Sequence, residues 1–589
     1  MNNKNNIQMI RKMMFRLLPV QILLAAAGSV NGIVSSYFAS NYVGLDAMSA
    51  VGLYGPVSMM IGAVSTVLSG GSAIICGRYL GQNEQGKLQK VFSLDLFLTA
   101  LTAVLFTAVL LAMGMFDLTG IFTQDMSIRP AFNRYLLGQA IGVIPMMVGN
   151  QLPMFLAMEN KGRRALNASL VYIAVNLALN ILFVQTMHME AFGLALASSL
   201  GMWVFMFAEI GHFLSKESNL KITFADIAWK EWTVVLLIGF PGAATYIYQT
   251  FRGLAVNRLL EMTAGSAGLS AFAAANNLLG IFWAIPAGMQ AVSSLLISVS
   301  IGEEDRESLT NVMRGMFRYY VPVMCGVIAC IIALAVPLTY IFFKDPSQDV
   351  FRYMVSGLRI LPLCMPLSII KMHFTVYGQA ADRNGFVNVL SLLDGLICVA
   401  GYSWLLKDIL GMKSVYAANV LNGVTTTLYI IAYAWFRKKH LPRNMEELMA
   451  IPDSFGVPES DRIDVVVQTE DDVVRVSEQI ENFCLQKGAD KKRSYYAGLA
   501  MEEMAGNVVS HGFTKDKKTH SVEMRAVWKE DTVILRVRDD CIPFDPKERA
   551  GMLDDADPSR NIGIRMIYGM MQDIRYQYLL GMNVLTVRI

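Results

Sequence analysis

GQNEQGKLQKVF (residues 81–92) and GEEDRESLTNVM (residues 302–313) are the two stretches that decide the fold of this chain. Each begins with glycine, continues with polar residues, and closes a Gly/Ala-rich apolar region that starts at a proline, Pro19 or Pro241. The proline and the glycine are 62 residues apart in the first region and 61 in the second. Chance similarity between apolar segments is the alternative, but the matching polar loops argue against it. The match predicts an internal repeat of two halves.

Around these loops, twelve segments are apolar over about 20 residues, which is the length that crosses a bilayer. We place them at 15–39, 51–75, 92–114, 131–156, 169–187, 191–214, 233–258, 269–297, 317–343, 350–378, 385–406 and 414–436. The sequence therefore predicts a polytopic α-helical membrane protein whose domain of residues 1–440 holds two six-helix repeats, at about 10–231 and 232–440. Parallel repeats of this kind are typical of secondary transporters with a binding cavity between the halves.

The charges support this division. Charged residues make up only 16% of the chain, against about 25% in soluble domains. Residues 1–440 carry a net charge of +9 and residues 441–589 a net charge of −6, which together give the +3 of the whole chain. Basic residues are concentrated in alternate connecting segments, which places both termini in the cytoplasm. Basic loops beside membrane lipid explain the positive charge, so no nucleic-acid partner is expected.

Several short motifs carry a family resemblance over residues 10–440. They are FASNYVGLDAMSAVGL (38–53), SGGSA (69–73), GRYLG (77–81) and GFPG (239–242), together with Asn176 and Asn180 in the fifth predicted span. Their order and the repeat resemble the multidrug and toxic compound extrusion (MATE) transporters. The resemblance implies an antiporter in the plasma (inner) membrane of a bacterium, which exports an organic, often cationic, substrate in exchange for Na⁺ or H⁺.

The chain departs from that family where coupling carboxylates are common. The first span has Ser35 and Ser36 in place of an acid, with Asn31 upstream, and the seventh span has Gln249 eight residues after Pro241. Two expected acids are therefore missing. We keep Asn31 and Gln249 as residues that line the cavity.

Ionisable residues inside spans are candidates for function because a charge at bilayer depth is costly. Lys371 and Asp394 lie in the neighbouring tenth and eleventh spans, where they either pair with each other or take part in transport. Asp394 is the best remaining carboxylate for a proton or Na⁺. The other candidates could instead lie near span ends and reach headgroups; they are Asp95, Glu209, Arg252 and Arg359.

The chain becomes polar after residue 440. Residues 441–460 contain three prolines and read as a linker. Residues 461–589 form a compact domain in which we expect helices at 471–486 and 491–511. Strands are expected at 463–467, 520–528, 532–538, 574–579 and 584–589. The pattern predicts an α/β sandwich with a helix layer on a mixed sheet.

Three ordered motifs lie in this domain. In MEEMAGNVVSHGF (501–513), Glu503, Asn507 and His511 are spaced by four and share one helix face. DDCIPFDP (539–546) follows a predicted strand, and NIGIRMI (561–567) opens a helix. An ordinary amphipathic helix is the alternative for the first motif alone. Together the motifs resemble the ATP site of the GHKL superfamily, and within it the anti-sigma-factor serine kinases.

The resemblance implies a site for Mg-ATP, with His511 on its helix. Asn507 would offer an oxygen to Mg²⁺, and Glu503 would act as the general base. Asp539 would accept from the adenine amino group, and Gly563 at a helix start would let backbone N–H groups approach phosphate. Common glycine positions are instead occupied by Cys541, Pro543 and Asn561, so ATP binding is better supported than turnover.

We therefore predict a secondary exporter of organic cations with a cytoplasmic ATP-binding regulatory domain. The chain contains no GxxxxGK[ST] loop, so ATP is not expected to drive transport directly. The alternative is a membrane-anchored serine kinase whose spans sense a ligand and whose partner is a protein of the anti-anti-sigma (STAS) type. A histidine kinase is disfavoured because residues 441–502 contain no histidine.

Overall fold

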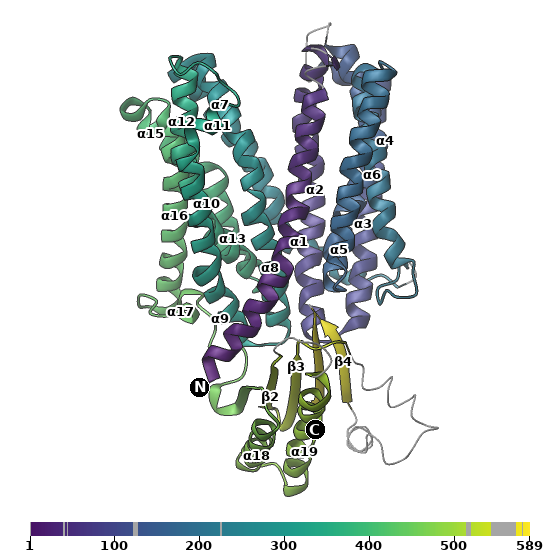
Figure 1. Ribbon diagram of the computed structural model, residues 1–589, viewed down its shortest axis with the longest axis vertical. Coiled ribbons are helices and arrows are strands. Elements are labelled where there is room, and N and C mark those ends of the chain that lie inside the picture. The colour runs from purple at the N-terminus through teal and green to yellow at the C-terminus, as the bar shows by residue number, and fades with distance from the viewer. Residues whose placement is uncertain are drawn as a thin grey trace.

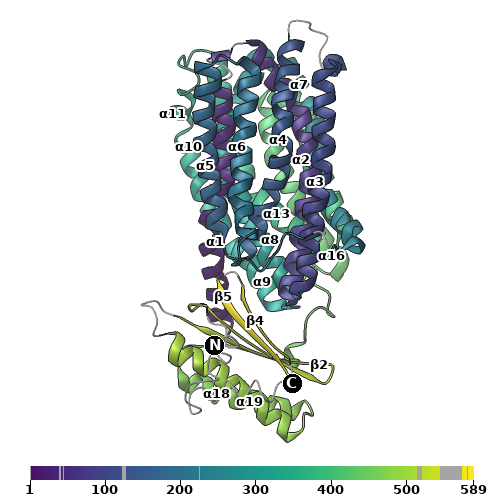
Figure 2. The same cartoon turned by 90° about the vertical axis from the view of Figure 1, so that its right-hand side faces the viewer.

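The computed structural model describes residues 2–38, 42–43, 45–121, 128–223, 226–513, 520–543, 573–579 and 581–589. A bundle of long helices carries a small α/β domain at one end (Figures 1 and 2). The N-terminal end of the first helix lies at this same end of the bundle (Figure 1). We call this end of the bundle, where the α/β domain lies, the domain end.

Six long helices form the first half of the bundle. They are α1 (Asn2–Phe38), α2 (Leu45–Gly81), α3 (Gln85–Met115), α4 (Arg129–Met158), α5 (Gly162–Asn180) and α6 (Glu190–Phe213). A π-helical segment, η3 (Ile181–Thr186), extends α5, and η2 (Leu118–Ile121) and η4 (Trp229–Glu231) are short 3-10 turns.

The second half is more interrupted. Its helices are α7 (Trp232–Phe282), α8 (Ala284–Gly302), α9 (Arg306–Gly315), α10 (Val321–Ala333), α11 (Ala335–Thr339), α12 (Asp349–Ile360), α13 (Met365–Ala380), α14 (Asn384–Leu392), α15 (Cys398–Leu410) and α16 (Lys413–Lys438). Short turns join several of them into longer rods: η5 (Met316–Tyr320), η6 (Leu361–Cys364) and η7 (Leu393–Ile397). η5 and η7 are π-helical.

The bundle confirms the predicted polytopic helical fold. In the described residues, eleven helices are long and apolar enough to cross a membrane. α1 contains the first predicted span, 15–39, apart from its last residue. The eighth predicted span is built from the end of α7 and from α8, because α7 is interrupted at Gly265, whose φ is +58°. Glycine adopts this backbone conformation at little cost.

Equivalent glycines bring the two halves together at the domain end. Gly81 ends α2 and Gly302 ends α8, and each opens one of the two matched loops. A Cβ atom on Gly81 would lie 2.2 Å from the carbonyl oxygen of Val299, and one on Gly302 would lie 2.1 Å from that of Arg78. Only glycine permits backbones this close. The reciprocal contact is what a two-fold relation between the repeats produces.

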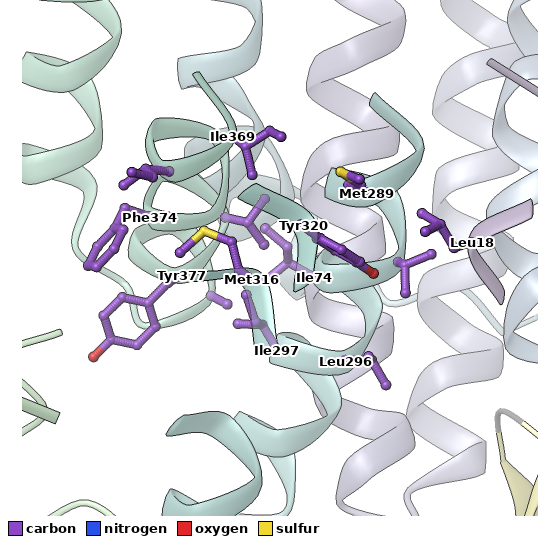
Figure 3. Packing of buried hydrophobic residues seen from close by; sticks show 14 of the residues in the cluster. Leu18, Ile74, Met289, Leu296, Ile297, Met316, Tyr320, Ile369, Phe374 and Tyr377 are labelled. Carbon is purple, nitrogen blue, oxygen red and sulfur yellow. The ribbon is translucent and has the colours of Figure 1, made fainter. Parts of the chain in front are cut away.

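A continuous apolar core fills the bundle near this contact. Figure 3 shows side chains from several helices converging there: Leu18 of α1, Ile74 of α2, Met289, Leu296 and Ile297 of α8, Met316 and Tyr320 of η5, and Ile369, Phe374 and Tyr377 of α13. Both repeats contribute to this cluster, so they pack as one body at this level of the bundle.

The C-terminal domain has two layers. Its strands are β1 (Arg462–Val467), β2 (Val522–Lys529), β3 (Thr532–Asp539), β4 (Asp573–Leu579) and β5 (Met582–Arg588), in the order β1-β2-β3-β5-β4. Two helices, α18 (Glu470–Gln486) and α19 (Lys491–Asn507), cover one face. The predicted strands and helices are confirmed, but the expected mixed sheet is wrong. All four pairings between these strands are antiparallel, because the α18–α19 hairpin returns the chain beside β1 in the opposite direction.

The two faces of this sheet differ in chemistry. Alternate residues of β2 and β3 are apolar and pack under the two helices, among them Met524, Leu535 and Val537. The residues between them are charged, and this second face points toward the helical bundle (Figure 2). The charged face is therefore covered by the rest of the chain.

The predicted linker also packs on the bundle. It contains a short helix, α17 (Met445–Leu448), and Met449 and Ile451 are buried in the main apolar core. Arg383 donates to the carbonyl oxygens of Met449 at 2.6 Å and Ala450 at 2.7 Å. These contacts fix the start of the C-terminal domain on the second repeat.

Candidate functional site

The first ATP-site motif lies at the C-terminal end of α19. Asp490 caps the other end of this helix by accepting from the backbone N–H of Arg493 at 2.8 Å. Glu503 and Asn507 are one turn apart, and the Asn507 side-chain amide donates to the carbonyl oxygen of Glu503 at 2.6 Å. This bond turns the amide nitrogen toward the helix, so the amide oxygen is the atom of Asn507 that can reach a cation.

The end of the helix touches the second motif. After Asn507 the chain continues as a π-helical turn, η9 (Val508–Gly512), which carries the exposed His511. A Cβ atom on Gly512 would lie 3.0 Å from the Cys541 Sγ atom. The structure thus brings the motif at 501–513 and the motif at 539–546 to the same place.

Asp539 is the buried carboxylate of the second motif. It ends β3, and its Oδ1 atom accepts from Asn583 Nδ2 at 2.7 Å and from the backbone N–H of Cys541 at 2.9 Å. Burial raises the pKa of this carboxyl group above its ordinary value. The position of Asp539 is therefore fixed by β5 and by its own loop. The Asn583 partner was not singled out from the sequence.

The neighbouring Asp540 links this motif to the bundle. Its carboxylate lies 3.0 Å from Lys12 Nζ of α1 and 3.1 Å from His520 Nδ1. Burial raises the pKa of Asp540, but the bonds from Lys12 and His520 outweigh burial and leave the pKa below its ordinary value. The motif that would hold adenine is thus in contact with the first helix of the bundle.

The third motif lies outside the described residues, and so do its Gly563 and Asn561. Among the described ones, Glu503, Asn507 and Asp539 offer a carboxylate, an amide oxygen and a second, buried carboxylate. These donor types fit Mg²⁺ and the amino group of a base, as the sequence predicted. The backbone N–H groups that would approach phosphate at Gly563 stay a prediction.

In the bundle, Lys371 and Asp394 form the pair that the sequence left open. The Lys371 Nζ atom of α13 lies 2.6 Å from Asp394 Oδ2 on η7. Asn422 of α16 donates to Asp394 Oδ1 at 2.9 Å, and Arg252 of α7 donates to the Asp394 backbone carbonyl at 3.4 Å. Four segments of the second repeat therefore meet at one residue, Asp394.

The other two transport candidates are less defined. Gln249 is exposed on α7, and its place in a cavity stays a prediction. Asn31 belongs to α1, but its side chain lies outside the described residues. The structure does not place these two candidates together.

The sequence left open that Asp95 and Glu209 lie near span ends and reach lipid headgroups. In the structure both side chains are fully buried. Asp95 of α3 accepts a hydrogen bond from Ser72 of α2 at 2.8 Å, and its other oxygen has no hydrogen-bond partner in the described part of the chain. Both carboxylate oxygens of Glu209 on α6 also lack a partner there. The presence of an acid inside an apolar span is the signal that identified them. That these two acids are buried could be seen only in the structure.

A buried charge network, absent from the sequence-based candidates, joins the domain to the bundle. Asp305, in the loop between α8 and α9, lies 2.6 Å from Arg525 of β2 and 2.8 Å from Arg536 of β3. The three side chains are between 1% and 8% exposed. Burial raises the pKa of a carboxyl group, but the arginines outweigh it and hold the pKa of Asp305 well below its ordinary value.

Two more acids of the same loop extend this network. Glu303 lies 2.7 Å from Arg536 and 2.6 Å from Arg538. Glu304 pairs with Lys529 at 2.6 Å, at a position where both side chains are about half exposed. Glu303, Glu304 and Asp305 are the acids of the GEED segment (302–305), which in the sequence served only as evidence for the internal repeat. We call Glu303, Asp305, Arg525, Arg536 and Arg538 the docking network.

Comparisons with known proteins cover both parts of the chain. A family model described as MatE matches residues 22–182 and 241–405. A model described as a histidine kinase-like ATPase domain matches residues 466–589. A search of curated proteins found no match.

Solved structures show the same fold for the bundle. A multidrug resistance MATE family transporter of the MOP superfamily, in an outward-facing conformation, is 20% identical with a TM-score of 0.68, over 76% of this chain and 99% of that one. A MOP superfamily transporter from Pyrococcus furiosus is 20% identical with a TM-score of 0.67, over 76% and 99%. A MATE transporter from Vibrio cholerae is 15% identical with a TM-score of 0.67, over 72% and 97%.

The MatE model covers more than half of the 589 residues and matches parts of both repeats, with residues 183–240, which include α6, left between the two matched regions. Its two matched regions correspond to the two halves that meet at Gly81 and Gly302. The chain therefore belongs to the MatE family of transporters and carries a histidine kinase-like ATPase domain at its C-terminal side.

Proposed function

We propose that this protein is a secondary active exporter of organic cations, driven by Na⁺ or H⁺, whose ATPase-like domain is cytoplasmic and regulates transport. Family membership and the MATE fold support export. The buried Lys371–Asp394 pair supports ion coupling, since an intramembrane carboxylate held by a cation can exchange that cation for another. Alternate basic connections support a plasma membrane location with both termini in the cytoplasm.

The docking network is the observation that carries the regulatory part of the proposal. A covalently attached ATP-binding domain needs no buried contact with the transporter merely to be tethered. Here Asp305 and Glu303 are buried against three arginines of the sheet. Burying charges is costly unless their geometry is good. Such an interface fits a domain whose position on the transporter matters for function.

The domain also contacts the first repeat. Lys12 pairs with Asp540, Arg16 donates to the Gly581 carbonyl oxygen at 3.0 Å, and Gln577 donates to the Leu80 carbonyl oxygen at 3.3 Å. The domain thus bridges both repeats at the end where Gly81 and Gly302 hold them together. Opening that end would require some of these contacts to break, which supports the proposal that ATP binding at Asp539 controls opening.

For the ATPase-like domain, we propose Mg-ATP as the ligand. Asn507 would bind Mg²⁺, Asp539 would accept from the adenine amino group, and His511 and Gly563 would lie beside the nucleotide. Glu503 would act as the general base if phosphoryl transfer occurs. ATP would supply the phosphoryl group and the binding energy. A STAS-type protein is the proposed partner if the domain acts as a serine kinase.

Transport itself is tested in cells. Expression of the full chain is expected to lower the accumulation of a lipophilic organic cation, because an antiporter moves the substrate outward as Na⁺ or H⁺ enters. Collapse of both ion gradients should abolish the effect. Unchanged accumulation across a broad panel of dyes and drugs would contradict export. Phosphorylation of a STAS-type protein without any export would favour the kinase alternative.

Asp394→Asn tests coupling in the second repeat. The variant keeps the acceptor for Asn422 but leaves Lys371 without its counter-charge. Gradient-dependent export is expected to be lost while the protein is still produced at the normal level. The measurement is cation efflux from loaded cells, with Arg359→Gln as a control because Arg359 is exposed. Export at the wild-type rate in Asp394→Asn would mean that Asp394 has a structural role.

A further inference from the structure

Asp95 differs from Asp394 in having no cation beside it. Asp394 is neutralised by Lys371, whereas the bond that Asp95 receives comes from the uncharged Ser72 hydroxyl. Asp95 is 0% exposed and lies ten residues into α3, which is about 15 Å from the start of that helix. An ionised carboxylate at this depth, without a counter-charge, is strongly disfavoured.

The helices around Asp95 supply no compensating charge. Residues 47–77 of α2, 91–115 of α3 and 135–158 of α4 contain no other Asp, Glu, Lys, Arg or His. The titratable group that faces Asp95 is the buried thiol of Cys76, one turn from Ser72. The short helix η4 contacts α3 through Trp229 and Phe97, and its Glu231 binds the Tyr79 hydroxyl at 2.9 Å.

The free oxygen of Asp95 is one of several unsatisfied polar atoms on α3 and α4. Asp95 Oδ2, Thr99 Oγ1 and Gln151 Oε1 are all buried without a hydrogen-bond partner in the described part of the chain. Phe92 of α3 contacts Phe155 of α4 with ring centroids 4.6 Å apart. The Gln151 amide donates to the Ser65 hydroxyl of α2 at 3.3 Å, two turns before the Ser72 that binds Asp95.

A proton on Asp95 resolves these features together. It removes the uncompensated charge and turns Oδ2 into an O–H group, which costs less to bury than an ionised carboxylate oxygen. Na⁺ would instead need several oxygens around it, whereas the Ser72 hydroxyl is the one hydrogen-bond partner of the Asp95 carboxylate in the described part of the chain. We propose that Asp95 is a proton-binding site of the transport cycle, protonated in the conformation described here and deprotonated when α2, α3 and α4 rearrange.

This inference deepens the proposed antiport and rests on it. The proton taken up from outside binds the Asp95 carboxylate, and the same proton leaves to the cytoplasm while one substrate cation moves outward. No bond other than O–H forms or breaks. Asp95 belongs to the first repeat and Asp394 to the second, so the two carboxylates are independent sites.

The test uses the full chain and two readouts. The first is infrared spectroscopy of the purified protein, in which a buried protonated carboxyl gives a C=O band that shifts in deuterated water. Asp95→Asn keeps the acceptor for Ser72 and is expected to remove one component of this band. Glu209→Gln is the matched control, because it removes another buried carboxylate, whose two oxygens lack a hydrogen-bond partner in the described part of the chain, and so a different component. Ser72→Ala should shift the Asp95 component without removing it.

The second readout is transport in liposomes, with tetraphenylphosphonium as the probe. Asp95→Asn should lose accumulation driven by a pH gradient and keep exchange of labelled for unlabelled probe without a gradient. Glu209→Gln should keep both. An unchanged infrared band in Asp95→Asn, or normal pH-driven accumulation in that variant, would overturn the proposal. So would a loss restricted to Na⁺-driven accumulation, which would make Asp95 a Na⁺ site.

Failure of the proposed function looks different from failure of this inference. If the wild-type protein moves no probe but Asp95→Asn still removes an infrared component, antiport is wrong and the protonated carboxyl is supported. If the wild-type protein exports the probe and Asp95→Asn changes neither readout, antiport stands and Asp95 is a structural residue.

Discussion

Asp305→Asn is expected to release the ATPase-like domain from the helical bundle. The substitution leaves the buried Arg525 without its one carboxylate partner within 3 Å, and it leaves Arg536 with Glu303 alone at that distance. Breaking a buried ion pair by removing one partner typically costs about 3–5 kcal/mol. Asparagine still caps α9, where Asp305 accepts from the backbone N–H of Ser308. The variant therefore removes the charge and keeps the helix end.

Hydrogen exchange on the full chain measures this release. Amides in the loop at 302–309, and in the edge of the sheet nearest to it, should exchange faster in Asp305→Asn. Glu304→Gln is the matched control, because its partner Lys529 and Glu304 itself are about half exposed. Exposed pairs contribute about 0–1 kcal/mol. Equal exchange in the two variants would contradict a structural role for the docking network.

The docking network also sets an expectation for pH. The pKa of Asp305 is held well below its ordinary value by the arginines. A carboxyl group with a depressed folded-state pKa stabilises at pH values above its ordinary pKa, and this contribution is lost as pH falls through the depressed value. Docking should therefore persist in mildly acidic buffer.

If ATP changes the transport rate of the wild-type protein, Asp305→Asn should abolish that response.

Asp539→Asn is expected to weaken ATP binding strongly. Because Oδ1 is engaged by Asn583 and Cys541, the second carboxylate oxygen would accept from the adenine amino group. In the variant, the atom that faces the adenine amino group would be either an amide nitrogen, which is a donor like the amino group itself, or an uncharged oxygen. A hydrogen bond to a charged group contributes about 1.5–3 kcal/mol, so affinity should fall by about ten- to a hundredfold. Calorimetry on the detergent-purified full chain measures it.

Three further variants make this test specific. Asp531→Asn is the control, because Asp531 is 82% exposed in the turn between β2 and β3. Asn507→Ala should remove the dependence of ATP binding on Mg²⁺. Glu503→Ala should spare binding and stop only phosphoryl transfer, if any occurs. No heat of binding for the wild-type protein would mean that Cys541, Pro543 and Asn561 have closed the site, and the domain would then be a protein-docking module.

The sequence determined the elements of this protein well. Apolar length located the spans because crossing a bilayer needs a fixed number of helical residues. The matched loops at 81–92 and 302–313 predicted the repeat, and Gly81 and Gly302 turned out to contact each other's helices. The strands of the C-terminal domain followed from alternation and β-branched residues, which are local properties. Pairing of Lys371 with Asp394 was one of two open possibilities, since neighbouring spans bring few charges together.

Only the tertiary structure decided what covers the charged face of the sheet and what surrounds Asp95. Arg525, Arg536 and Arg538 alternate with apolar residues in β2 and β3, a pattern that places them on one face of the sheet but does not say what covers that face. The structure buries that face on acids that lie far away in the chain, since Arg536 and Asp305 are 231 residues apart. Asp95, conversely, looked like a residue near a span end, yet it is sealed between α2, α3 and α4. Periodicity depends on neighbours within a few residues, so it specifies which side of an element is polar. What lies against that side depends on how distant elements pack, and in this protein that packing buries both Asp305 and Asp95.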